Sequence, residues 1–206
     1  MIISGRQLGV LVLIACASCG VRDRQLARSD TAPAWRQMGD VVDSIFPMKE
    51  YERRFRQRLT EVDTLAGGST SRDALVTQVM DAIAARDSAA LDALIITPAE
   101  FSWIVFPHHL YRDEPYALDP AIFWAQMQLA TKKGRRRLFN RYGGRNPSRI
   151  GVSCERDTTA ARDSLILWAP CSVRVTWDGV AGPGKYFGSI VEHNGRYKLM
   201  SLETDI

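Results

Sequence analysis

The stretch GKYFGSIVEHNGRYKLMSLE, residues 184–203, decides the fold of this chain. Its apolar and aromatic residues form two short runs separated by Asn194-Gly195, a pair typical of a two-residue β-hairpin turn. Upstream, the runs IGVSCER, SLILWAP and CSVRVTW, between residues 150 and 177, have the same short, β-branched character. The C-terminal part of the chain is therefore predicted to form an antiparallel sheet of about four strands.

Helical signals precede these strands. In DALVTQVMDAIAARDSAALDALI, residues 73–95, the apolar positions form one helix face, and Thr70 with Asp73 resembles a capping box. That face comprises Leu75, Val76, Val79, Met80 and Ile83. Ser88 starts a short second helix. Because helices come first and strands last, the predicted fold class is α+β.

Two further helices are marked by their ends. A helical turn is predicted to begin after Thr97, the N-cap residue, with Pro98 at its first position. Glu100 completes the capping box with Thr97, and Pro107 should end the turn. Asp119-Pro120 opens the longest helix, which Gly143-Gly144 ends.

These stretches resemble the nuclear transport factor 2-like superfamily. The terminal hairpin matches its pattern at Gly188, Ile190, Val191, Asn194, Gly195, Arg196, Tyr197, Lys198 and Leu199. The resemblance covers residues 70–206 and implies N-terminal helices packed on a curved antiparallel sheet that closes a cone. The extra helical length from Phe101 to Tyr142 departs from the family pattern. The resemblance therefore does not decide whether the cone closes. Since the superfamily hosts isomerases, dehydratases, binders and interaction domains, fold alone does not choose a function.

The N-terminus carries a targeting signal. Arg6 precedes an apolar run from Leu8 to Ala15 that is far shorter than the ~20 residues of a membrane span, so residues 1–15 are predicted to be a secretory signal peptide. Leu13-Ile14-Ala15-Cys16 resembles the bacterial lipoprotein box, which implies lipidation of Cys16. Cys19 is the alternative, without an aliphatic residue three positions upstream. Ala17 after Cys16 favours, by analogy, the periplasmic face of the outer membrane.

The mature chain is predicted to be a tether followed by one domain. Residues 16–34 are polar, lack periodicity and read as a flexible tether. Residues 35–206 form a single α+β domain with a helical lead-in at 35–66 and a core at 70–206. The lead-in helix begins at Pro47, carries a stripe of apolar residues and ends at Gly67-Gly68. That stripe comprises Tyr51, Phe55, Leu59 and Val62.

Two cysteines remain in the domain. In an oxidising envelope compartment, Cys154 and Cys171 are expected to form a disulfide. The alternative is a pair of buried thiols that act as small apolar side chains. A hairpin centred on DTTAAR, residues 157–162, would pair Cys154 nearer Leu165 than Cys171, so the sequence leaves this pairing open.

The segment PHHLYRDEPY, residues 107–116, holds the densest titratable chemistry. His108 or His109 is a weak candidate for a general acid or base, with Asp113 to orient it. The simpler interpretation is a surface loop between two prolines. A zinc site would need His193 or Asp113 as a third ligand and fits no common spacing, so no metal and no cofactor are predicted.

Eight cations without an intervening acid form the second candidate, a basic patch. They are Lys132, Lys133, Arg135, Arg136, Arg137, Arg141, Arg145 and Arg149. The secretory signal argues against nucleic acid as their partner. Cations favour a helix C-terminus, which explains two or three of them; the others are expected to form intramolecular ion pairs or to contact anionic headgroups.

The sequence thus favours a membrane-anchored envelope lipoprotein that binds a small apolar ligand or a protein partner without catalysis. One alternative is an acid–base isomerase or dehydratase with His108 or His109 in a cone pocket. The other is an anionic-surface binder that acts through residues 132–149.

Overall fold

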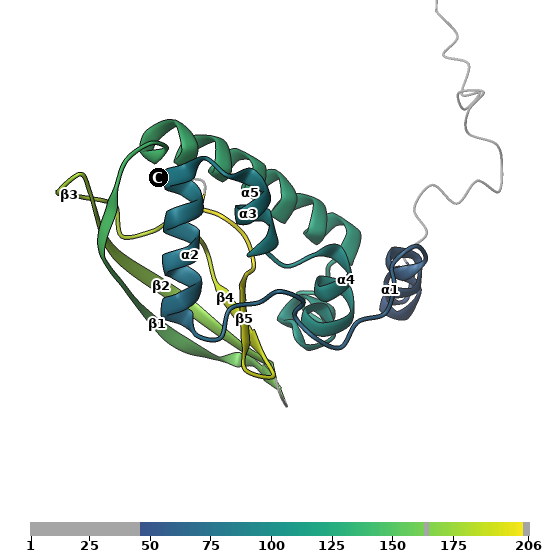
Figure 1. The fold of residues 1–206 in the computed structure, drawn as a ribbon. Helices are drawn as coiled ribbons and strands as arrows, with labels where there is room; N and C mark the ends of the chain where they lie inside the picture. The colour runs from purple at the N-terminus through teal and green to yellow at the C-terminus, as the bar shows by residue number, and fades with distance from the viewer. Residues whose placement is uncertain (1–45, 163–164, 204–206) are drawn as a thin grey trace, which may run out of the picture. The chain divides into compact units, whose positions relative to one another are not determined.

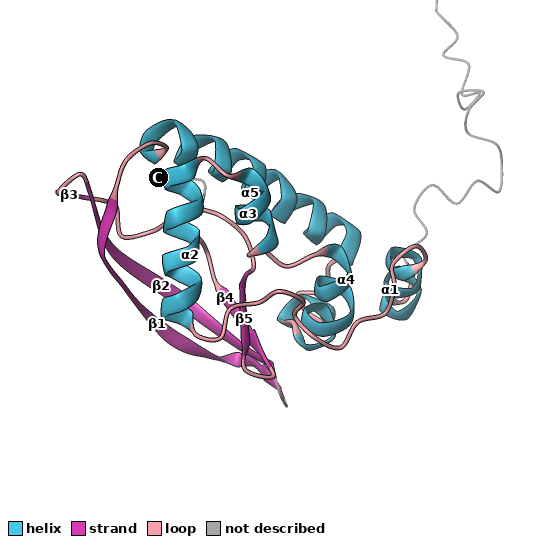
Figure 2. Cartoon of the chain, in the orientation of Figure 1, coloured by secondary structure: helices cyan, strands magenta, loops and turns pink. Residues whose placement is uncertain are grey.

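The computed structural model describes residues 46–162 and 165–203, and a curved antiparallel sheet dominates its second half (Figures 1 and 2). The strands are β1 (Pro147–Arg162), β2 (Leu165–Trp177), β3 (Val180–Ala181), β4 (Ile190–His193) and β5 (Arg196–Leu199). Their order is β1-β2-β4-β5, with β3 paired to the end of β2. The α+β prediction is confirmed.

The sheet has five strands where about four were predicted, and their limits differ. The runs SLILWAP and CSVRVTW join into the single strand β2, and the two-residue β3 adds a strand. Asn194 and Gly195 form the predicted turn between β4 and β5, and both have positive φ angles, of 50° and 71°. This turn matches the sequence prediction because its backbone needs residues that tolerate the left-handed region.

Helices fill the first half of the described chain. They are α1 (Met48–Arg56), α2 (Arg72–Ala85), α3 (Ser88–Ala93), α4 (Pro98–Glu100) and α5 (Pro120–Tyr142). A π-helical turn, η1 (Phe101–Val105), and two 3₁₀ turns, η2 (Phe106–His108) and η3 (Leu110–Arg112), connect α4 to α5. The capping box of Thr97 and Glu100 and the start of α5 at Asp119-Pro120 are as predicted.

Three predicted helix limits are wrong. The lead-in helix ends at Arg56 rather than before Gly67, because the chain must leave the helix for Leu65 to enter the core. Ser71 caps α2 in place of Thr70 and accepts a hydrogen bond from the Ala74 N–H at 3.1 Å. Pro107 does not stop the helical segment, because it lies inside η2.

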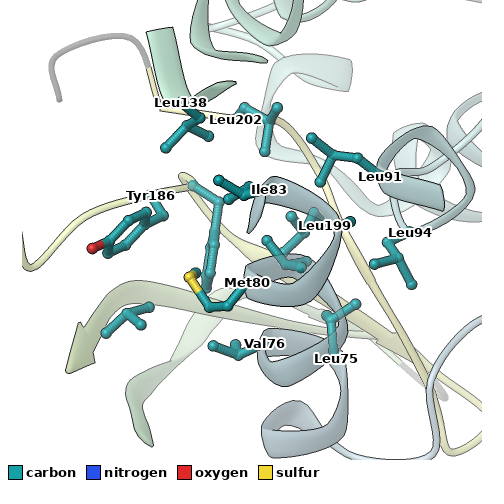
Figure 3. Close-up of a cluster of buried hydrophobic side chains, with 14 of the residues drawn as sticks. Leu75, Val76, Met80, Ile83, Leu91, Leu94, Leu138, Tyr186, Leu199 and Leu202 are labelled. Carbon is teal, nitrogen blue, oxygen red and sulfur yellow. The ribbon is translucent and has the colours of Figure 1, made fainter. Parts of the chain in front are cut away.

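One core lies between α2 and the concave face of the sheet (Figure 1). The predicted apolar face of α2 is completely buried there: Leu75, Val76, Val79, Met80 and Ile83 are each 0% exposed. Figure 3 shows Leu138 of α5 and Leu202, which follows β5, lying near Ile83 of α2. The amphipathic period of α2 therefore sets which face of the helix packs on the sheet.

A second core covers the opposite face of the sheet at β4 and β5. Ile190 and Leu199 are cross-strand partners that face the α2 core, whereas the neighbouring pair Val191 and Lys198 belongs to the other side. There Val191 lies in a cluster with Phe101 and other side chains of η1. Both faces of this half of the sheet are therefore buried.

The predicted disulfide is present and joins Cys154 of β1 to Cys171 of β2. The two residues are direct cross-strand partners with Cα atoms 4.1 Å apart. The hairpin centred on DTTAAR is wrong, because residues 157–162 belong to β1 and Arg162 pairs with Leu165 of β2. Register irregularities after Cys154 and Asp157 bring the two cysteines opposite each other.

Candidate functional site

Helix α5 carries most of the predicted basic patch, and its buried side fixes which residues point outward. Asp119 caps the helix by accepting a hydrogen bond from the Ala121 N–H at 2.8 Å. Met127, Gly134, Leu138 and Tyr142 recur at helical spacing on the buried side. At Gly134 the backbone of Glu203 passes so close that a Cβ atom would lie 2.4 Å from its carbonyl oxygen. This contact fixes the rotation of α5 about its axis.

The opposite side of α5 combines exposed apolar and cationic residues. Ile122 and Leu129, seven positions apart on the same side of the helix, are 50% and 70% exposed. Lys132, Lys133 and Arg136 follow within two turns and are exposed. We call these five residues the α5 outer face. No Asp or Glu occurs between Pro120 and Cys154, so no acid within this segment neutralises the face.

A hollow of about 510 Å³ lies on this side of the helix. It is lined by Leu129, Lys132, Lys133, Arg135, Arg136 and Phe139. Leu129 and Phe139 offer apolar contacts, and the Lys and Arg side chains can donate hydrogen bonds to an anionic group. The hollow therefore has the composition of a surface that contacts anionic amphiphiles.

The eight cations of the predicted basic patch are in different environments. Arg135 donates to Asp92 of α3, with Nη1 to Oδ1 at 2.6 Å, and the Arg141 guanidinium lies 5.6 Å from the Tyr142 ring centre. Lys132, Lys133 and Arg136 form no ion pair with any residue that the structure describes. Arg137, Arg145 and Arg149 are exposed. Lys132, Lys133 and Arg136, which pair with no described acid, lie together on the α5 outer face.

The histidine candidates lie beside α5 in different environments. His109 is buried, and its ring packs 4.9 Å from the Tyr111 ring and 4.8 Å from the Phe123 ring, centre to centre. Its Nδ1 accepts a hydrogen bond from the Tyr111 N–H at 3.2 Å. His108 is half-buried, and Asp113 is exposed and pairs with Arg112 at 3.3 Å.

Within residues 46–162 and 165–203, no three His, Cys, Asp or Glu side chains lie in an arrangement that could hold a metal ion. His193, considered as a third zinc ligand, instead places Nε2 3.0 Å from the carbonyl oxygen of Asp63.

Aromatic side chains pack against the concave side of the sheet, where the isomerase or dehydratase alternative requires a cone pocket. The Trp177 Nε1–H donates to the Tyr186 hydroxyl at 2.9 Å, and the Tyr142 ring stacks on Trp177 with centres 4.8 Å apart. Burial raises the pKa of Tyr186 to about 12. These three rings are almost completely buried and pack with the α2 core. They act as core side chains, which argues against a catalytic role for this region.

Sequence reasoning found the basic tract but missed two features. One is the buried pair of Lys198 in β5 and Glu100 in α4. The other is the exposure of Ile122 and Leu129, for which the signal was apolar residues on the charged side of a helix. The lipidation candidates Cys16 and Cys19 lie outside the described residues.

No helix of the described part of the chain is both long and apolar enough to traverse a membrane. Comparisons with protein-family models, with curated proteins and with solved structures each found no match to this chain.

Proposed function

We propose that this chain is a lipid-anchored protein of the bacterial cell envelope whose α5 outer face binds anionic lipid headgroups without catalysis. The observation that carries the proposal is the group of three cations, Lys132, Lys133 and Arg136, that form no ion pair with a described residue and lie beside exposed Leu129. Such a combination suits a membrane interface, where cations meet headgroups and apolar side chains enter the acyl boundary.

The N-terminal signal supplies the second half of the proposal. In this proposal residues 1–15 act as a signal peptide and Cys16 as the acylated first residue, and the domain lies on the periplasmic face of the outer membrane. A lipid anchor combined with a polybasic surface gives stable membrane attachment. The domain itself is assigned to the nuclear transport factor 2-like class, supported by its α+β order and curved antiparallel sheet.

The expected free energy of attraction to anionic lipid supports a lipid partner for the α5 outer face. Each cation near an anionic surface contributes about 1 kcal/mol at moderate ionic strength. Three cations therefore contribute about 3 kcal/mol, roughly a hundredfold in partition coefficient. Ion pairs between the face and other described residues do not offset this attraction, since Lys132, Lys133 and Arg136 have none.

Flotation with vesicles tests the membrane contact. The full chain is produced by cell-free synthesis without lipid-modifying enzymes and mixed with phosphatidylglycerol-containing or pure phosphatidylcholine vesicles at two salt concentrations. We expect binding to the anionic vesicles that weakens at high salt, because screening shortens the range of surface charges. Equal binding to both vesicle types, or binding that salt does not change, would contradict the proposal.

Mass spectrometry of the protein purified from bacterial membranes tests the anchor. We expect a chain that begins at Cys16 and carries acyl groups, and we expect the Cys16→Ser variant to lack them. Acylation that persists in Cys16→Ser and disappears in Cys19→Ser would instead assign the anchor to Cys19.

A further inference from the structure

A second hollow, of about 630 Å³, lies between α5 and the segment that joins α3 to α4. One side is formed by Asp92, Ile95, Ile96, Thr97 and Pro98, and the other by residues of α5 between Trp124 and Arg135. We call this hollow the α3–α5 groove. Its volume falls within the range of small-molecule sites in proteins, roughly 300 to 1,000 Å³.

The floor of the groove is held in place by β5. The Leu199 N–H donates to the Leu94 carbonyl oxygen at 2.8 Å, and the Ile96 N–H donates to the Leu199 carbonyl oxygen at 2.9 Å. Ile95 and Ile96 are therefore fixed, and both are almost completely buried. A groove with such a floor is already formed before any ligand arrives.

Polar and apolar groups are separated along the groove. Trp124 and Ala125 line one end, and Lys132 and Arg135 line the other, about 12 Å further along the helix axis for the eight residues from Trp124 to Lys132. Arg135 is neutralised by Asp92 across the groove, at 2.6 Å. Lys132 has no ion-pair partner among the described residues, so one uncompensated positive charge remains at this end.

From this separation we propose that the α3–α5 groove binds a single-chain anionic amphiphile, such as a fatty acid. The acyl chain lies along Trp124, Ala125 and the isoleucine floor, and the anionic headgroup contacts the Lys132 ammonium. The inference shares Lys132 with the membrane contact proposed above, but it does not require the domain to bind a membrane.

Displacement of a dansyl-labelled fatty acid from the full chain tests this inference. Dodecanoate, dodecanol and decanoate are the competitors. We expect dodecanoate to compete better than dodecanol, because only dodecanoate has a charge for Lys132. We expect decanoate to compete roughly tenfold more weakly than dodecanoate, because two fewer methylenes are buried.

Two matched variants locate the bound ligand. Gln128 and Gln126 are both exposed on α5, but only Gln128 lines the groove. Gln128→Trp should abolish displaceable binding of the labelled fatty acid, and Gln126→Trp should bind it like the parent chain. Circular dichroism confirms that both variants are folded. Equal binding by the two variants would place the ligand elsewhere and overturn the inference.

Charge variants separate this inference from the membrane proposal. Lys132→Gln should reduce the preference for dodecanoate over dodecanol, whereas the double variant Lys133→Gln/Arg136→Gln should bind dodecanoate normally while losing vesicle binding. Three results would overturn the groove inference: no saturable binding of the labelled fatty acid, equal competition by dodecanol and dodecanoate, or displacement by inorganic phosphate as effective as by dodecanoate. The last result would indicate a site for small anions.

Discussion

The Nζ atom of Lys198 lies 3.0 Å and 3.1 Å from the two carboxylate oxygens of Glu100, and each residue is only 2% exposed. The same carboxylate also accepts hydrogen bonds from the Ala66 N–H and the Thr97 N–H, both at 2.7 Å. Glu100 thus connects the lead-in segment, the first turn of α4 and strand β5. The pair thus attaches α4 to β5, on the face of the sheet that the second core covers.

Breaking the Lys198–Glu100 pair from one side should strongly destabilise the domain. Lys198→Met leaves a buried carboxylate and Glu100→Gln leaves a buried ammonium, so each should lower the free energy of unfolding by about 3 to 5 kcal/mol. The double variant should recover much of that loss, because neither charge then remains unpaired. Urea denaturation of the three variants measures the effect, and additive losses in the double variant would contradict this account.

Alkaline pH should destabilise the fold through Tyr186. Its pKa is raised to about 12, mainly by burial, from an ordinary value near 10. Since the unfolded chain releases this proton at lower pH, the contribution of Tyr186 to stability is complete below pH 10 and is lost as the pH rises toward 12. Ultraviolet titration of tyrosinate, together with urea denaturation across this pH range, measures both quantities.

Tyr186→Phe is the matched control for the alkaline effect. It should reduce the dependence of the unfolding free energy on pH in this range. At neutral pH it should cost about 1 to 3 kcal/mol, because the buried Trp177 Nε1–H loses its acceptor. An unchanged alkaline slope in Tyr186→Phe would assign the pH effect to another group.

Gly134→Ala should destabilise the domain although alanine favours helices. The gain in helix propensity is about 1 kcal/mol, but the new Cβ would lie 2.4 Å from the Glu203 carbonyl oxygen and 2.9 Å from the Leu202 Cβ. Overpacking of this kind costs about 1 to 3 kcal/mol, and because the atom in the way is a backbone oxygen we expect a net loss of stability. Asn140→Ala, at an exposed position of α5, also raises helix propensity and should not lower stability, so it is the control for a gain without overpacking. A Gly134→Ala variant more stable than the parent would show that the backbone beside α5 moves away easily.

Removing the disulfide should lower stability without changing the fold. Cys154 and Cys171 are 17 positions apart, and closing a loop of this size contributes about 3 kcal/mol in the chain-entropy model. The double variant Cys154→Ala/Cys171→Ala should lose about that amount in urea denaturation. Reductant should destabilise the parent chain and leave the double variant unaffected; sensitivity of the double variant would point to another disulfide.

Elements whose structure depends on neighbouring residues along the chain could be predicted from the sequence. The buried face of α2 follows from its 3.6-residue period, and the Asn194-Gly195 turn follows from its backbone requirement. The pairing of Cys154 with Cys171 could not be predicted. Irregularities within β1 shift the register of the β1–β2 pair, and no short sequence pattern indicates the size of such a shift.

Tertiary packing decided the features that the sequence did not predict. Lys198 alternates with apolar neighbours, a pattern typical of a strand with one side in solvent, yet η1 covers that side of β5. For α5, the sequence identified the cations, but the contact of Gly134 with the C-terminal segment determines that Ile122 and Leu129 are exposed beside them.

Vesicle binding by two triple variants of equal net charge tests the proposed membrane contact most directly. Lys132→Gln/Lys133→Gln/Arg136→Gln removes the cations of the α5 outer face, and Arg58→Gln/Arg174→Gln/Lys185→Gln removes three exposed cations elsewhere. The account predicts that the first variant loses roughly a hundredfold in affinity for phosphatidylglycerol vesicles and that the second binds like the parent. Equal losses in the two variants would mean that net charge, and not the α5 outer face, holds the domain on the membrane.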